Sequence, residues 1–459
     1  MTAVHRSSAL IGIGLVILGG GMVAQRNSTV PQPQAARLPA IGPATPNRGA
    51  LVDPPAGVMP AVPAGFTVSV YAELQGPRMM VYAPNGDLFV SSPSTNSITV
   101  LRDANQDGVF EARSVYGQGE PPAGRGGPPP AGRLGGPPPP VNPQINGPIL
   151  GASAPACVEP PAFTNRGPGT VAAPFGMAFH DGYLYVGNTG SLVRFKYANG
   201  DLQAQGAPEK LLDLPVGGHS TRNIVFNRAG TKLYMTVGSG SNNNAGEDCR
   251  RAAILEFNPD GSGYRVYASG IRNPVGLTLQ PGTDVIWTAV NERDNLGDDL
   301  VPDYATSVKD GGFYGWPYSY IGANSDPRYV GAFPDLVKRA TVPDVLIPAH
   351  SAALGITFYT GTQFPARYRN GGFVALHGSW NRSVASGYKV AFFPVAKGRP
   401  GPLEDFMTGF IVADGSGGEQ LSRWGRPVGV TVAPDGSLLV SDDGSHRIWK
   451  ISAARGGTR

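Results

Sequence analysis

The sequence GLTLQPGTDVIWTAVN at residues 276–291 indicates the fold, because it contains one complete β-hairpin. Two apolar strands flank a Pro-Gly turn, and such alternation around turn residues is typical of a hairpin. The pattern recurs at residues 79–92, 176–188, 223–238, 355–378 and 429–443. Six hairpins at this spacing predict an all-β protein, a six-bladed β-propeller. A pair of β-sandwiches is the alternative, and it is disfavoured because the repeat continues without a break.

The two ends of this repeat are expected to meet. The strand GFTVSVYA at residues 65–72 precedes the first hairpin, and HRIWKISA at residues 446–453 follows the last. Pairing of the two would complete the last blade and leave no free sheet edge. Gly 65 and Pro 45 make up about a quarter of the 459 residues, which disfavours a mainly helical fold.

Composition divides the chain into three parts. Residues 1–24 place Arg6 before an apolar run, which predicts a signal peptide or a signal anchor and therefore a periplasmic or secreted protein. Residues 25–64 form a Pro/Ala-rich linker, for which we expect disorder. Residues 65–459 form the propeller domain, interrupted at 117–170 by a Pro/Gly-rich loop insertion, which includes the segment GRGGPPPAGRLGGPPPP that cannot pair as a ladder. Cys157 and Cys249 are compatible with one disulfide, but their spacing does not show that they pair.

The net charge of +4 does not point to nucleic acid. Residues 1–60 carry three of the excess positive charges and residues 117–172 carry the fourth, so the remainder is neutral. A neutral body lacks the basic footprint of a nucleic-acid-binding protein. Contact with a membrane is expected only through an uncleaved leader.

Basic or proton-transferring side chains stand just before five of the six first strands. If these strands begin beside a central channel, the side chains converge on one mouth and form a cationic pocket. Arginine grips carboxylates and phosphates through paired hydrogen bonds, so the set predicts an anionic ligand. The alternative for each arginine is a bond to loop carbonyls. The residues are Arg78, His219 with Arg222, Arg272 with Asn273, His350 and Arg426.

Three further features belong to this prediction. His219 is the best candidate base, because a neutral imidazole can take a hydroxyl proton. His377 and Arg382, in HGSWNR, end the fifth hairpin and could reach the same mouth. The loop NERDNLGDDL at residues 291–300 is rich in the oxygens that Ca²⁺ prefers, although such acids are often solvated turn residues.

Taken together, these segments resemble the soluble glucose/sorbosone dehydrogenase family. The resemblance covers about residues 65–453, without the insertion. The segments are GGHSTRNIVF, YASGIRNPVGLTL, NERDNLGDDLVPDY, DGGFYGWPY, PAHSAALGITFY, HGSWNRS and RPVGVTVAPDGSLLVSDD. The family implies an exported six-bladed propeller that uses pyrroloquinoline quinone (PQQ) with Ca²⁺ and passes electrons to a quinone or a small cytochrome. Its members oxidise a sugar, an aldehyde sugar or a polyol by hydride transfer.

The resemblance also implies roles. His219 would be the catalytic base, and Arg272 would polarise the quinone carbonyl. Cofactor-binding residues would be Arg222, Asn273, His350, His377, Arg382 and Arg426, while backbone carbonyls near Arg293 and Asp294 would hold Ca²⁺. Where the glucose oxidisers of the family have Gly-Pro, this chain has Arg293-Asp294, and it has Val275 where they have glutamine. Glucose is therefore not implied as the substrate.

Two other functions remain open on the sequence. A calcium-dependent lactonase could use a similar propeller, but it would hold its metal with axial carboxylates and would have little use for several arginines. A non-catalytic binding propeller would explain the repeats but not the pairing of His219 with Arg272.

Overall fold

The computed structural model describes residues 38–105, 107–120 and 166–454. Strands dominate this part of the chain, and its one α-helix is the five-residue α1 (Pro334–Lys338). Three short 3₁₀ helices lie at Pro93–Thr95, Pro327–Tyr329 and Ala366–Tyr368. The prediction of an all-β protein is confirmed.

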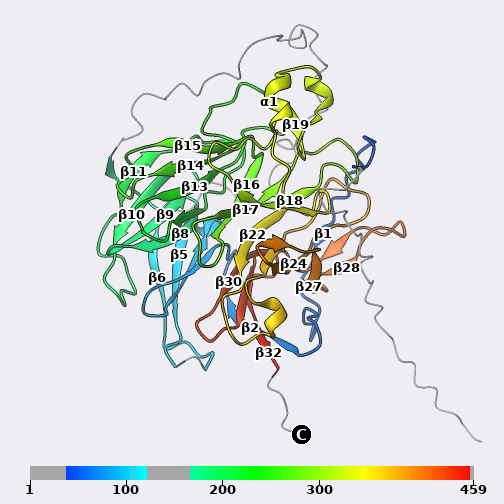
Figure 1. Cartoon of the computed structure of the whole chain (residues 1–459). Helices are drawn as coiled ribbons and strands as arrows, with labels where there is room; N and C mark the ends of the chain where they lie inside the picture. The colour runs from blue at the N-terminus through cyan, green and yellow to red at the C-terminus, as the bar shows by residue number, and fades with distance from the viewer. Residues whose placement is uncertain (1–37, 106, 121–165, 455–459) are drawn as a thin grey trace, which may run out of the picture.

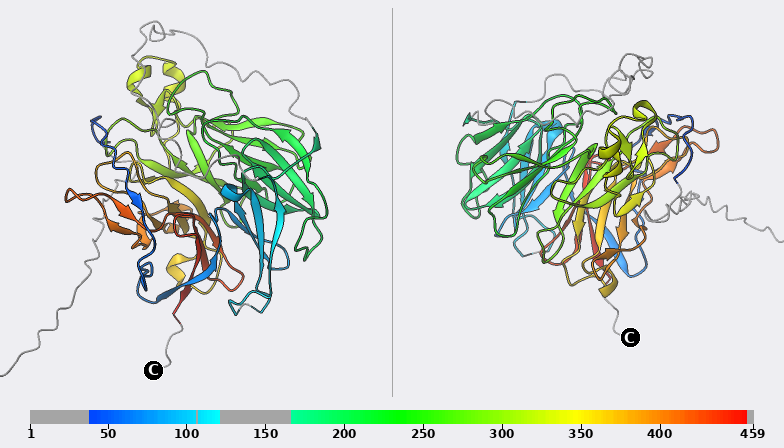
Figure 2. Two further views of the ribbon diagram at one scale, coloured as in Figure 1. Left: turned by 180° about the vertical axis from the view of Figure 1, so that it is seen from behind. Right: turned by 45° about the horizontal axis from the view of Figure 1, so that its top comes forward.

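Six antiparallel sheets of four or five strands follow one another along the chain (Figures 1 and 2). Each begins with one of the predicted hairpins, and all six hairpins are observed. The first sheet contains β3 (Met80–Tyr82), β4 (Leu88–Ser92), β5 (Ser97–Arg102) and β6 (Ala112–Gln118). The second contains β8 (Pro174–His180), β9 (Tyr183–Asn188), β10 (Ser191–Lys196), β11 (Glu209–Asp213) and the short edge strand β7 (Gly167–Pro168). The third contains β12 (Ile224–Phe226), β13 (Leu233–Val237), β14 (Ala253–Phe257) and β15 (Arg265–Ser269).

The other three sheets have the same order. The fourth contains β16 (Asn273–Leu279), β17 (Ile286–Asn291), β18 (Asp303–Val308) and β21 (Val345–Ile347). The fifth contains β22 (Ala353–Phe358), β23 (Gly372–Leu376), β24 (Lys389–Phe393) and β27 (Glu404–Met407). The sixth contains β30 (Pro427–Val432), β31 (Leu438–Asp442), β32 (Arg447–Ala453) and β2 (Phe66–Glu73).

The first strands of the six sheets contact one another in a cycle. Along the chain, β3 contacts β8, β8 contacts β12, β12 contacts β16, β16 contacts β22, β22 contacts β30, and β30 contacts β3. A cavity of about 470 Å³ is lined by residues of all six strands. The first strands of the six sheets therefore surround one central cavity.

The predicted pairing of the two ends of the repeat is confirmed. β2 pairs antiparallel with β32, from Phe66 opposite Ala453 to Glu73 opposite Arg447. Figure 1 shows the two strands side by side. The N-terminal strand of the domain therefore completes the sheet that contains the C-terminal hairpin.

Glycines in three first strands allow the sheets to approach closely. A Cβ on Gly276 would lie 2.4 Å from the carbonyl oxygen of Leu354, and one on Gly429 would lie 2.4 Å from that of Arg78. Gly355 faces the carbonyl of Val428 in the same way. Only glycine fits such contacts, which explains the V-G-L, L-G-I and V-G-V sequences of these strands.

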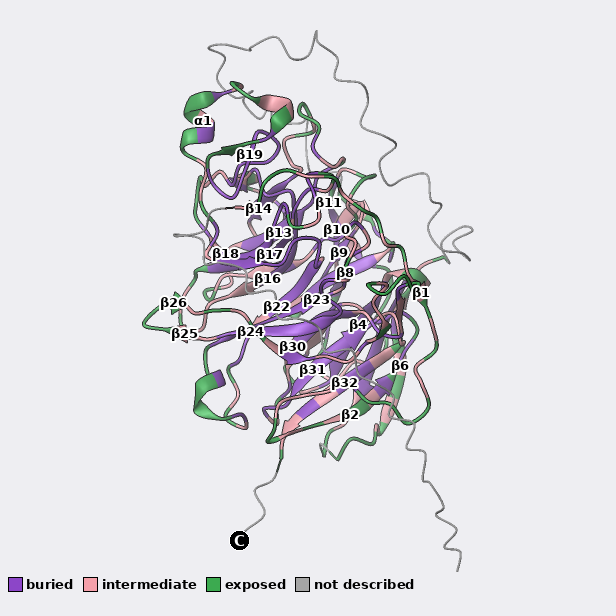
Figure 3. Cartoon of the chain, turned by 90° about the vertical axis from the view of Figure 1, so that its right-hand side faces the viewer, coloured by how far each residue is buried: buried purple, intermediate pink, exposed green. Residues whose placement is uncertain are grey.

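A small apolar cluster sits where these strands begin. It consists of Met79, Val275, Leu354 and Val428. Larger clusters fill the spaces between neighbouring sheets, and Figure 3 shows that most strands are buried while α1 and the β25–β26 turn (Val395–Ala396 and Arg399–Pro400) are largely exposed. The apolar cluster separates the residues that precede the strands from the cavity that their later residues line.

The expected linker is not free over its described part. Residues 38–52 form an arm along the edge of the molecule, and β1 (Ala50–Leu51) pairs in parallel with β29 (Ser422–Arg423), which also pairs with β28 (Ile411–Ala413). Asn47 donates from its side chain to the carbonyls of Ser383 and Asp414. The sequence pattern did not predict these contacts, because they are mostly made by backbone and polar groups and leave no apolar periodicity.

Several predicted features lie outside the described residues. These are the leader at 1–24, most of the insertion, and Cys157. Cys249 is disulfide-bonded. Within the described ranges, no helix is both long and apolar enough to cross a membrane.

Candidate active site

The predicted residues gather around the starts of the first strands. Arg78 precedes Met79, Asn273 stands two residues before Val275, and Arg426 stands two residues before Val428. Because these apolar residues touch one another, the residues preceding them border one region above the apolar cluster. Two polar groups make up the site, one around Arg272 and one around Arg426.

His219 is held as a neutral imidazole. Its Nδ1 lies 2.8 Å from the backbone oxygen of Ser239 and 3.1 Å from the Ser239 hydroxyl, which itself donates to the carbonyl of Ser241. A carbonyl oxygen only accepts, so Nδ1 carries the hydrogen and Nε2 keeps its lone pair. Burial and the nearby charge of Arg272 lower the pKa of His219 to about 3. The ring is therefore a proton acceptor at neutral pH.

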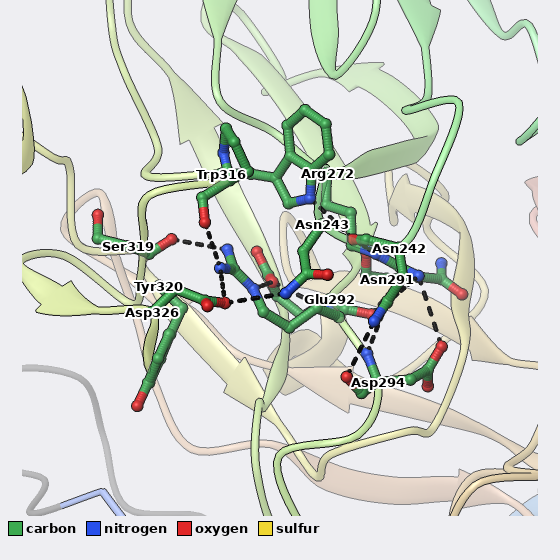
Figure 4. A network of polar contacts seen from close by, with 12 residues as sticks. Asn242, Asn243, Arg272, Asn291, Glu292, Asp294, Trp316, Ser319, Tyr320 and Asp326 are labelled. Atoms are coloured by element: carbon green, nitrogen blue, oxygen red, sulfur yellow. Dashed lines mark hydrogen bonds and ion pairs between the residues drawn. The ribbon is translucent and has the colours of Figure 1, made fainter. Parts of the chain in front are cut away.

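Arg272 is buried and oriented by its neighbours (Figure 4). Its Nε donates to the carbonyl of Asn242 at 3.0 Å, and Nη2 donates to the Asn242 side-chain oxygen at 2.9 Å. Nη1 donates to the carbonyl of Glu292 at 2.6 Å. Two further contacts, to the carbonyl of Asn291 and to Asp294 Oδ2, are both 3.4 Å long and therefore weak.

Asn273 lies beside His219. A Cβ on Gly238 would lie 2.4 Å from Asn273 Oδ1 and 2.6 Å from His219 Cβ, so both side chains flank one glycine. The Oδ1 atom is buried and accepts no hydrogen bond from the described residues. An orphaned buried acceptor costs free energy, so a donor from a ligand would stabilise it.

Buried His350 forms an ion pair with half-buried Asp294. His350 Nδ1 lies 3.2 Å from Asp294 Oδ1, and its Nε2 lies 2.8 Å from the carbonyl of Gly297. Burial opposes the charge on both groups, but the contact with Asp294 raises the pKa of His350, and the contacts with His350 and Arg272 lower the pKa of Asp294. Both ring nitrogens face acceptors, which fits an imidazolium.

Arg293 has no free guanidinium for a ligand. Its side chain is fully buried and bonds Glu292 Oε2 at 3.0 Å and Asp326 Oδ2 at 2.8 Å. It also donates to the carbonyls of Pro317 and Ser319. The backbone carbonyl of Asp294, a predicted metal ligand, accepts from the side chain of Asn242 at 3.0 Å.

The acidic loop is held mainly by protein partners. Asp298 accepts from Ser383 and from the backbone of Thr45, and Asp299 pairs with Arg382 at 2.6 Å. Arg382 thus contacts the loop through Asp299. The described residues contain no group of three or more His, Cys, Asp or Glu side chains with metal-site geometry.

The second polar group joins the fifth and sixth sheets to the first. Asp443 accepts from Arg78 Nη1 at 2.5 Å and lies 2.7 Å from His377 Nε2. Arg426 Nε donates to the carbonyl of His377 at 3.2 Å. Burial and Arg426 lower the pKa of His377 to about 4, so this ring is neutral and donates from Nε2 to the carboxylate.

This second group has more positive than negative charge. Arg78, Arg423 and the carboxylate of Asp443 all lie within electrostatic range of Arg426. Arg423 Nε and Nη1 and Arg78 Nε are buried and have no hydrogen-bond partner among the described residues. Half-buried guanidinium groups with buried, unpaired donor atoms and few carboxylates nearby favour an anionic ligand.

Arg222 occupies a different position from the predicted one. It is fully buried, and its guanidinium donates to the carbonyls of His219, Thr221 and Pro215. Burial and the charge of Arg251 lower its pKa to about 9. Arg222 therefore holds the loop that carries His219, as the alternative for a lone arginine anticipated.

The sequence reasoning missed four residues of the site. Asn242, in S-N-N-N, gave no signal because an asparagine run is typical of a turn. The sequence around Ser239 and Arg423 also gave no signal that they belong to the site. Asp443 ends the sixth hairpin in V-S-D-D, and its place one residue beyond a buried strand was a usable signal.

Comparisons with known proteins identify the family. The glucose/sorbosone dehydrogenase family model matches residues 187–379, and a TrAA12-like model matches residues 337–454. The chain belongs to the glucose/sorbosone dehydrogenase family. An uncharacterised protein of Borreliella burgdorferi is 30% identical over 299 residues, covering 61% of this chain and 76% of that protein.

Two further proteins show a more distant similarity to this chain. The PQQ-dependent pyranose dehydrogenase of Coprinopsis cinerea is 28% identical over 304 residues, covering 52% of this chain but 40% of its own length. The holo structure of its PQQ domain has a TM-score of 0.62 at 19% identity, covering 87% of this chain and 98% of that one. The calcium structure of a Trichoderma reesei family AA12 enzyme has a TM-score of 0.64 at 16% identity, covering 86% and 97%. At these identities the structures show a shared fold.

Proposed function

We propose that this chain is a six-bladed propeller that oxidises a sugar, an aldehyde sugar or a polyol with PQQ and Ca²⁺. The observation that carries the proposal is that two cationic groups, around Arg272 and around Arg426, stand at the starts of first strands whose apolar residues form one cluster. The cyclic contacts of the six first strands support the propeller. Each sheet then serves as one blade, and the mouth of the central channel serves as the active site.

The residues fit a flat, polycarboxylate cofactor. Buried donor atoms on Arg78 and Arg423 have no hydrogen-bond partner among the described residues, and these arginines lie near Arg426. The carboxylates of PQQ would bind there and beside Arg272 and His350. The orphaned Oδ1 of Asn273 would accept a hydrogen bond at the same mouth. Bound PQQ would supply the two-electron acceptor for the substrate's hydride.

His219 would remove the substrate's hydroxyl proton. The bond from Nδ1 to the carbonyl of Ser239 fixes the tautomer, so Nε2 is the accepting atom. A low pKa keeps this nitrogen unprotonated before the reaction. The nearby charge of Arg272 disfavours the imidazolium that forms, so the proton must pass on readily to solvent or product.

Arg272 would act as the electrophile. Its three short hydrogen bonds fix the plane of the guanidinium, while the two contacts of 3.4 Å can be given up for a ligand oxygen. A preorganised positive charge stabilises negative charge that develops at the reacting carbonyl.

Calcium would bind at the backbone carbonyls of Arg293 and Asp294. A carbonyl oxygen has two lone pairs, so the Asp294 carbonyl can keep Asn242 and still bind a cation. The apolar leader supports a periplasmic or secreted location, and a quinone or a small cytochrome would accept the electrons.

Reconstitution tests this function. Apo protein is mixed with PQQ and Ca²⁺, and dye reduction is followed with a panel of sugars, polyols and lactones. The proposal expects quinone-dependent dye reduction that His219→Ala abolishes. Lactone hydrolysis with metal alone would support a lactonase instead, and failure to take up the quinone would leave a binding propeller.

A further inference from the structure

Asn242 makes more hydrogen bonds to residues of the candidate site than the neighbouring asparagines do. It lies in the segment between β13 and β14 and is half-buried. Its side-chain oxygen accepts from Arg272 Nη2 and from the backbone nitrogen of Asp294, both at 2.9 Å. Its side-chain nitrogen donates to the carbonyl of Asp294 at 3.0 Å. One amide group therefore joins the guanidinium of Arg272 to the backbone of the acidic loop (Figure 4).

The backbone of Asn242 is fixed as well. Its carbonyl accepts from Arg272 Nε at 3.0 Å and from Trp316 Nε1 at 2.9 Å. Trp316 belongs to the G-G-F-Y-G-W-P turn, so this turn, Asn242 and Arg272 are linked directly. Because the carbonyl contact does not depend on the side chain, a substitution at Asn242 removes only the second bond to Arg272.

We propose that Asn242 is a positioning residue that sets the direction of the Arg272 guanidinium. The Asn242 side-chain oxygen holds Nη2, the Asn242 carbonyl holds Nε and the Glu292 carbonyl holds Nη1, which leaves the edge with the two long contacts to face the ligand. The inference rests on the proposed function, in which Arg272 meets the quinone.

The chemistry requires an amide at this position. Asparagine accepts and donates through one planar group, and both of its ends are used on Asp294. Aspartate would keep the acceptor but lose the donor, and its charge would lie near the Asp294 carboxylate. Alanine would leave Arg272 Nη2 and the Asp294 backbone nitrogen without this acceptor.

The two following asparagines have other partners, and Asn244 provides a matched control. Asn243 donates to Asp326 at 3.2 Å and accepts from Arg328, so it belongs to the buried ion-pair group around Arg293. Asn244 is exposed, and its side chain accepts only from Arg328 at 3.1 Å among the described contacts. Asn244→Ala removes the same amide two residues away without touching Arg272.

The test compares Asn242→Ala, Asn242→Asp and Asn244→Ala. We expect Asn242→Ala to lower kcat by about 10- to 100-fold, because small misplacements of a catalytic group have effects of this size. KM for the sugar should change less than about threefold, and the absorbance of the bound quinone should shift. Asn242→Asp should not restore kcat, and Asn244→Ala should behave as the unmodified protein.

Crystal structures of the apo proteins separate this inference from the proposed function. In Asn242→Ala the Arg272 guanidinium should be displaced, and in Asn244→Ala it should not. An unmoved Arg272, or an unchanged kcat and quinone spectrum in Asn242→Ala, would overturn the positioning role. Failure of the unmodified chain to bind PQQ would instead overturn the proposed function.

Discussion

Replacement of Arg293 by methionine tests how the acidic loop is held. Arg293 and both of its carboxylate partners, Glu292 and Asp326, have fully buried side chains. Removal of the guanidinium leaves two buried carboxylates without their cation and two carbonyls without a donor. Breaking a buried ion pair costs about 3–5 kcal/mol, and the loss of the two further hydrogen bonds places Arg293→Met at the upper end of that range.

Urea unfolding measures this loss. With a slope of about 3 kcal/mol per molar urea for a large domain, the midpoint should fall by about 1–2 M. The triple variant Arg293→Met, Glu292→Gln, Asp326→Asn should recover part of the loss, because it leaves no buried charge unpaired. Arg367→Ala, which removes a largely exposed partner of Glu404, is the control and should shift the midpoint little. A loss below about 1 kcal/mol in Arg293→Met would show that the loop does not depend on this ion-pair group.

Three further predictions follow from individual contacts. Asn47→Ala should lower the free energy of unfolding by about 1–2 kcal/mol in thermal melts, because it removes two hydrogen bonds that fix the N-terminal arm. Thr45→Ala should be neutral, because the hydrogen bond of Thr45 among the described contacts comes from its backbone nitrogen. Equal effects of the two substitutions would show that the Asn47 side chain does not fix the arm. Gly276→Ala should lower the free energy of unfolding by more than about 2 kcal/mol, because the added Cβ would meet the backbone of β22. Gly167→Ala should have little effect, because the space around Gly167 is open. An unchanged stability of Gly276→Ala would contradict the close approach of β16 to β22. Since His219 has a pKa lowered to about 3, kcat/KM of the reconstituted enzyme should show no acid limb near pH 6.5 from this residue. NMR titration of the His219 ring with a midpoint near pH 6.5 would refute the neutral ring.

The hairpins could be predicted because they are local. Strand alternation and turn residues specify β16 and β17 without any knowledge of the remaining chain, and the pairing of β2 with β32 followed from the need to cover sheet edges. Arg272 and Arg426 directly precede first strands in the sequence, and this position predicted that both side chains lie where those strands begin.

The partners of the side chains could not be predicted in the same way. Arg222 and Arg272 both stand near the start of a first strand, yet Arg222 turns to its own loop carbonyls while Arg272 meets Asn242 and Glu292. The difference depends on residues distant in sequence, and the sequence pattern does not encode it. The ion pairs of the Arg293 side chain could not be predicted for the same reason, because its partner Asp326 lies 33 residues away.

Titration of the apo protein with PQQ and Ca²⁺ tests the account most directly. Absorbance at fixed ionic strength should show saturable uptake of one quinone per chain. Arg426→Ala should weaken this binding at least about tenfold, because it removes a guanidinium from the mouth, and Arg367→Ala should not weaken it. No uptake by the unmodified protein, or equal affinities in the two variants, would contradict the convergence of cationic side chains on one anionic cofactor.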